Sequence, residues 1–126
     1  MFASVKYTGT TPGADSNTYN LVNSITGGWP GYWPAVMGVH KVLLDIHHDK
    51  AGTIKWYKSM DDIPTQSPTW VQMDEVAVAA PVSTDGTQVE ILVEAQKHVK
   101  IDWVNSGTAQ TTFHVNIGLT DQRAGA

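Results

Sequence analysis

The stretch TTFHVNIGLT, from Thr111 to Thr120, alternates apolar and polar side chains with the period of two residues that a β-strand imposes. One face of this strand carries Phe113, Val115, Ile117 and Leu119. The opposite face carries Thr112, His114 and Asn116. Such a pattern predicts a strand that buries one face against a core and leaves the other face in water.

Strand patterns recur upstream of this stretch. HVKIDWV, from His98 to Val104, and QVEILVEA, from Gln88 to Ala95, alternate in the same way. The turn signal DKAG separates VHKVLLDIH, from Val39 to His47, from TIKWYKS, from Thr53 to Ser59, and Trp70 to Val78 supplies one more strand. We therefore expect two hairpins, one between the strands that flank DKAG and one that joins HVKIDWV to the last strand through the turn NSGT.

Five or more short strands with Gly and Pro between them, and no convincing helix pattern, predict an all-β fold, an antiparallel β-sandwich or a jelly roll. A chain of 126 residues that is 41% hydrophobic fits one domain around one core. We assign residues 39–126 to the sandwich. Residues 1–38 are expected to form an extended N-terminal arm followed by an aromatic loop rich in Gly and Pro, because up to about Ile25 the apolar residues are too sparse to cover a helix face.

The charge and cysteine content limit the classes of function. Eight Lys and Arg against twelve Asp and Glu give a formal net charge of −4 with no basic run, which argues against a nucleic-acid partner. The absence of cysteine excludes disulfides and thiolate metal sites and favours synthesis in a reducing compartment. No run approaches the twenty apolar residues of a membrane span, and the first residues lack a signal-peptide pattern, so we expect neither a membrane partner nor export by a signal peptide.

Motifs of catalysis are missing from the sequence, which contains no G-x-S-x-G, H-E-x-x-H, Walker or G-x-G-x-x-G pattern. The best metal-ligating candidates are His40, Asp45, His47, His48 and Asp49. On one strand His40 and His47 point to opposite faces, so this cluster lacks a complete ligand set. A second pair, His98 and His114, would meet across the expected hairpin, but solvent-facing histidines of this kind are more often plain surface residues. We predict no catalytic residue, no metal and no cofactor, and expect that the protein is not an enzyme.

Two phrases in the second half of the chain follow a recognisable order. The first is GTIKWYKSMDD, from Gly52 to Asp62, with Trp70 after it, and the second is HVKIDWVNSGTAQTTFHVNIGLTDQRA. Both resemble phrases of the β-domains of tailed-bacteriophage virion proteins, although this chain has a longer loop before its Trp than the tight Asp-Gly of the first phrase. The matching positions of the closing phrase are Asn105, Gly107, Ala109, Gln110, Thr111, Phe113, Leu119, Arg123 and Ala124.

The resemblance implies a small jelly-roll virion protein, similar to the cement, or head decoration, proteins of tailed bacteriophages. Such a protein would be made in the host cytoplasm, bind the outer surface of the major capsid protein shell and stabilise it from the capsid exterior. The resemblance also implies a homotrimer at or near threefold positions, with a dimer as the competing assembly. Because the same phrases occur in tail-associated modules, the alternative is a tail- or surface-associated carbohydrate-binding virion module.

The segment GGWPGYWP, from Gly27 to Pro34, places Trp29, Tyr32 and Trp33 in a loop. These rings would either pack over one end of the sandwich or anchor an interface with a second subunit or with the capsid. They could also stack on sugar rings. We favour packing or an interface, because no cluster of Asp, Asn and Arg accompanies the aromatic residues to bind sugar hydroxyls.

Overall fold

The computed structural model describes residues 2–23, 39–59, 69–80, 86–92 and 98–121, and these residues form eight β-strands and no helix. None of the described residues belongs to a helix long and apolar enough to cross a membrane. The strands are β1 (Phe2–Lys6), β2 (Thr18–Asn23), β3 (Val39–His48), β4 (Gly52–Ser59), β5 (Val71–Val78), β6 (Thr87–Leu92), β7 (His98–Asn105) and β8 (Phe113–Asp121).

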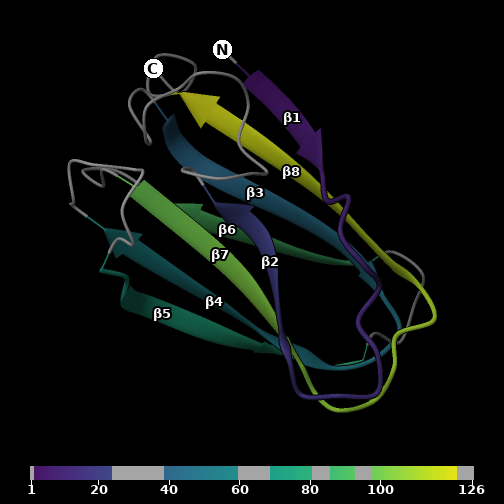
Figure 1. Ribbon diagram of the computed structural model, residues 1–126. Coiled ribbons are helices and arrows are strands. Elements are labelled where there is room, and N and C mark those ends of the chain that lie inside the picture. The colour runs from purple at the N-terminus through teal and green to yellow at the C-terminus, as the bar shows by residue number, and fades with distance from the viewer. Residues whose placement is uncertain (1, 24–38, 60–68, 81–85, 93–97, 122–126) are drawn as a thin grey trace.

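The strands form two four-stranded antiparallel sheets that pack face to face (Figure 1). We call them sheet A, with the order β1-β8-β3-β6, and sheet B, with the order β2-β7-β4-β5. Every connection except the one from β4 to β5 carries the chain from one sheet to the other. Eight strands in this order make a jelly roll, so the predicted all-β sandwich is confirmed.

Both expected hairpins are wrong. β3 and β4 lie in opposite sheets, and so do β7 and β8, although each pair is joined by a short turn. The turn between β7 and β8 contains Gly107 with a φ of 104°, a conformation that glycine adopts without strain. Alternation fixes which side chains of a strand face the core, but it does not say whether a tight turn pairs two strands or crosses the sandwich.

The predicted N-terminal arm is also corrected, since its first 23 residues supply two strands of the sandwich. β1 pairs with β8 at the edge of sheet A, and β2 pairs with β7 at the edge of sheet B. β2 buries Leu21 and Val22 next to a register shift, and a strand this short needs few apolar residues because the backbone ladder holds it. The sandwich therefore begins at Phe2. Trp29, Tyr32 and Trp33 lie outside the described residues.

One hydrophobic core fills the space between the two sheets. The face predicted for β8 is confirmed, because Phe113, Val115 and Ile117 are buried. The fully buried side chains also include Leu44 of β3 and Ile101 of β7. Trp103 is 0% exposed, and its ring centroid lies 5.2 Å from that of Phe113 in an edge-to-face contact. A Cβ atom at Gly52 would collide with the Trp103 indole, so the first glycine of the virion-like phrase is a packing requirement.

Phe113→Ala should lower the free energy of unfolding by about 3 to 5 kcal/mol. The Phe113 ring is buried and makes edge-to-face contacts with Tyr7 and Trp103, so its removal leaves a cavity between the sheets. Urea unfolding followed by tryptophan fluorescence measures the change, with Thr112→Ala, an exposed neighbour, as the control. A loss below about 1 kcal/mol would show that this face is not part of the core.

Candidate functional site

A buried amide network at one end of the sandwich contains two residues of the closing virion-like phrase. Asn105 is 2% exposed, and its Nδ2 donates to the carbonyl oxygens of Gly13 at 2.8 Å and Thr108 at 2.9 Å. Its Oδ1 accepts hydrogen bonds from Trp103 Nε1 at 3.2 Å and Gln110 Nε2 at 2.9 Å. The Asn105 side chain therefore holds the loop between β1 and β2 against the turn between β7 and β8.

Gln110 extends this network to the turn between β3 and β4. Its Oε1 accepts hydrogen bonds from the backbone N–H groups of Asp49 at 3.1 Å and Lys50 at 2.9 Å, and its Nε2 donates to the Lys50 carbonyl at 3.0 Å. The Gln110 backbone N–H donates to the Pro12 carbonyl at 3.0 Å. The matching residues Asn105 and Gln110 thus have a structural role, because they tie three connections together.

The predicted metal candidates are divided between the core, a turn and the surface. His48 is buried, with Nδ1 at 2.7 Å from the Lys50 carbonyl oxygen and Nε2 at 2.8 Å from Thr87 Oγ1. Asp49 accepts hydrogen bonds from the Thr111 N–H at 2.8 Å and the Thr111 hydroxyl at 2.7 Å. Both side chains are occupied in holding the fold. The His40 side chain lies outside the described residues.

Three of the remaining candidates, Asp45, His47 and His114, lie on the outer face of sheet A. Asp45 Oδ2 lies 3.2 Å from His47 Nε2, and His47 stands directly opposite His114 in the β3–β8 ladder. His114 and His98 belong to different sheets, so the expected pairing of these two histidines is wrong. Within the described ranges no three His, Asp or Glu residues are placed to hold a metal ion.

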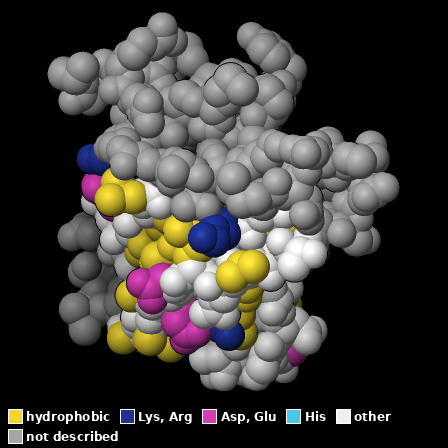
Figure 2. Space-filling view, turned by 90° about the vertical axis from the view of Figure 1, so that its left-hand side faces the viewer, with side chains coloured by type: hydrophobic (Ala, Val, Ile, Leu, Met, Phe, Trp, Pro, Cys, Tyr) yellow, Lys and Arg dark blue, Asp and Glu magenta, His cyan; other side chains and the backbone are white. Residues whose placement is uncertain are grey.

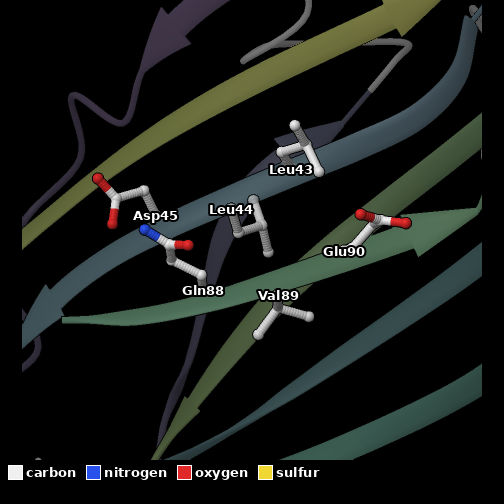
Figure 3. A pocket seen from close by; sticks show the side chains of 6 residues that line it. All are labelled: Leu43, Leu44, Asp45, Gln88, Val89 and Glu90. Carbon is white, nitrogen blue, oxygen red and sulfur yellow. The ribbon is translucent and has the colours of Figure 1, made fainter. Parts of the chain in front are cut away.

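A hollow lies beside Asp45 on this outer face, between β3 and the edge strand β6 (Figure 3). Its lining residues are Leu43, Leu44, Asp45, Gln88, Val89 and Glu90. In the ladder Asp45 stands opposite Gln88, and Leu43 stands opposite Glu90. The Leu43 side chain, two carboxylates and an amide therefore face the hollow, whereas Leu44 and Val89 turn toward the core.

The outer face of sheet B carries two aromatic rings around an ammonium group. Lys100 Nζ lies 4.5 Å from the Tyr57 ring centroid and 5.2 Å from the Trp70 ring centroid. Asp102, which is 4% exposed, accepts a hydrogen bond from Asn20 Nδ2 at 2.8 Å and lies 3.8 Å from Lys100. Burial and the nearby Asp102 charge raise the pKa of the Tyr57 hydroxyl. These aromatic and polar groups form what we call the sheet B platform.

The edge strand β5 exposes apolar side chains. Its seven residues from Val71 to Ala77 are all exposed, including Val71 at 52%, Met73 at 37% and Val76 at 37%. Figure 2 views the side of the molecule on which β4 and β5 lie in Figure 1, and hydrophobic side chains are interspersed there with acidic and basic ones. We call Val71, Met73 and Val76 the β5 patch.

No family model and no curated protein matches this sequence. Among solved structures, the chain is similar to the PBSX exported protein XepA, with a TM-score of 0.63 and 16% sequence identity. The match covers 94% of this chain and 37% of the XepA chain, so this chain spans little more than a third of that protein. At this level of identity the likeness shows a shared fold.

Asp49→Asn should destabilise the protein at neutral pH, and this destabilisation should diminish in acid. The Thr111 hydroxyl and then the Thr112 N–H lower the pKa of the Asp49 carboxyl to about 2, below its usual 3.8. Because the folded-state pKa is lowered, the ionised carboxylate stabilises the fold above about pH 4, and this contribution disappears as the pH falls through about 2.

Urea midpoints measured from pH 7 down to pH 2 test this expectation. The difference between the parent protein and Asp49→Asn should shrink through that range, whereas Asp74→Asn, which removes a charge from exposed β5, controls for net charge. A difference between the parent and Asp49→Asn that stays constant with pH would contradict the assigned role of the carboxylate.

Proposed function

We propose that this chain is a bacteriophage cement protein that binds the outer surface of the major capsid protein shell and stabilises it. The observation that carries the proposal is the β5 patch, an apolar surface on the edge of a small domain. Exposed apolar side chains on one strand, mixed with charged ones, are found at protein interfaces. The virion-like phrases support the same proposal, and the fold shared with the PBSX exported protein XepA is compatible with it.

The edge of β5 is built for side-chain contacts rather than for strand addition. Trp56 pairs with Asp74 and Tyr57 with Gln72, which leaves Met73 at a bulge in β5. Asp74 and Glu75 add two negative charges to the same edge. Bulges and charges discourage the open-ended pairing of edge strands, so the β5 patch meets its partner with side chains.

In this proposal the protein acts by binding and not by catalysis, and its place is the capsid exterior after synthesis in the host cytoplasm. It assembles as a homotrimer, with a dimer as the alternative, since a symmetric oligomer multiplies weak contacts with a symmetric shell. The net charge of −4 fits a protein partner better than nucleic acid. Trp29, Tyr32 and Trp33 stay a predicted packing or interface loop.

The copy number of this chain in purified particles tests the proposal directly. Quantitative mass spectrometry against the major capsid protein should give a simple ratio between the two chains. A copy number set by the symmetry of the tail would favour a tail module, and absence from particles would refute membership of the virion.

The double variant Val71→Ser, Met73→Ser should stay folded but bind shells more weakly, because both side chains are exposed and contribute through an interface. Cosedimentation with shells that lack the protein measures binding, and light scattering during gel filtration measures the oligomer. Gln72→Ser, on the same strand, is the matched control. Unchanged binding and assembly in the double variant would remove the β5 patch from the interface.

The sheet B platform favours carbohydrate binding as a second candidate function. Aromatic rings next to Lys100 and Asn20 match the way in which proteins bind sugars, with ring faces against apolar sugar surfaces and polar groups at the hydroxyls. The sequence offered no such polar cluster around GGWPGYWP, whereas the platform combines residues from β2, β4 and β7 with Trp70 just before β5.

On this second candidate, Trp70→Ala should lose about tenfold in affinity for a glycan found by array screening, with the fold retained. Thr53→Ala, which lies on the same sheet away from the rings, is the control. Isothermal titration measures both variants. Failure of the parent protein to bind any glycan, or equal binding by Trp70→Ala, would exclude the platform as a sugar site.

A further inference from the structure

Asp45 has an unusual position for a carboxylate. It lies near the middle of β3 on the outer face of sheet A, and its Oδ2 is 3.2 Å from His47 Nε2. Its Oδ1 is buried and has no hydrogen-bond partner within the part of the chain that the structure describes. The Asp45 side chain as a whole is 37% exposed, so a donor from outside the chain can reach this carboxylate and supply hydrogen bonds that the fold does not.

The hollow beside Asp45 defines the chemistry of that group. Figure 3 shows the Gln88 amide beside the Asp45 carboxylate, with Glu90 farther along β6. Leu43 supplies aliphatic surface on the same face, whereas Val89 packs against the core. The nearby cation Lys41 is already engaged, since its Nζ lies 3.3 Å from Glu90 Oε1. Among the described residues the Asp45 carboxylate therefore has no Lys or Arg partner, while Leu43 can contact a short hydrocarbon chain.

These features select one class of ligand. The two carboxylates disfavour an anion, and no three metal-ligating residues converge here among the described ones. A charged N–H donor makes a stronger hydrogen bond to a carboxylate than a neutral donor does. We propose that the hollow between β3 and β6 binds an alkyl-ammonium or alkyl-guanidinium group, with the Asp45 carboxylate as the anchoring acceptor.

Each lining residue has a definite role in this site. Asp45 provides the charge, and His47 holds the carboxylate through Oδ2. The Gln88 carbonyl accepts a second N–H of the cation, and Leu43 contacts the alkyl chain. The ligand is either a free amine or the side chain of a Lys or Arg residue of a partner protein, because both sources present the same chemistry.

Titration of the 15N-labelled full chain with n-butylguanidinium, followed by NMR, tests the site without any shell, so its outcome does not depend on the cement proposal. Saturable shifts should occur at residues 43–45 and 88–90 with a dissociation constant on the order of 1 mM. The uncharged analogue n-butylurea should produce no saturable shifts there. Equal binding of n-butylurea, or no saturable shift with n-butylguanidinium, would overturn the proposal.

Asp45→Asn should weaken n-butylguanidinium binding by at least about tenfold, and Asp74→Asn is the matched control on β5. If Asp45→Asn does not fold, Gln88→Leu at an exposed position replaces it and should weaken binding several-fold. Unchanged affinity in the folded variant would overturn the assignment. Nα-acetyl-arginine N-methylamide identifies the source, because its binding would assign a partner side chain, whereas binding of n-butylguanidinium alone would assign a free amine.

Discussion

The buried pair of amides at Asn105 and Gln110 is the constraint on which this jelly roll depends. Because nearly every connection crosses from one sheet to the other, three connections meet at one end of the sandwich, and their backbone groups need partners there. The chain contains no cysteine, so no disulfide can tie them together. Two side chains that are 2% and 5% exposed satisfy these groups and set how the loops join.

The sequence predicts the faces of the strands well and their partners poorly, for a physical reason. Which side chains of β8 enter the core is a local property of a pleated strand, and Val115 and Ile117 are buried as expected. The partner of a strand depends on whether the next turn crosses the sandwich. The sequence before residue 24 did not predict β1 and β2 for a related reason. Both are edge strands, and edge strands are held largely by backbone hydrogen bonds.

The candidate sites were harder to foresee because each depends on the register between strands that are distant in sequence. His48 and Asp49 stood out as metal ligands but serve the fold. In contrast, no sequence motif marked Tyr57 and Lys100 as site residues. They become neighbours only because β4 pairs with β7 in one register. Trp70 joins them from the segment just before β5. Alternation along a single strand carries no information about such clusters.

The structural role of the closing phrase separates evidence for the fold from evidence for function. Asn105 and Gln110 form hydrogen bonds with backbone groups at the end of the sandwich. Any jelly roll that joins its connections in this way would retain similar residues, whatever it binds. Specific function must therefore reside in surfaces that this network leaves free. The β5 patch lies on an edge, the platform covers the outer face of sheet B, and the hollow opens on the outer face of sheet A. Since the two outer faces point in opposite directions, a partner bound at one of them leaves the other open to a second ligand.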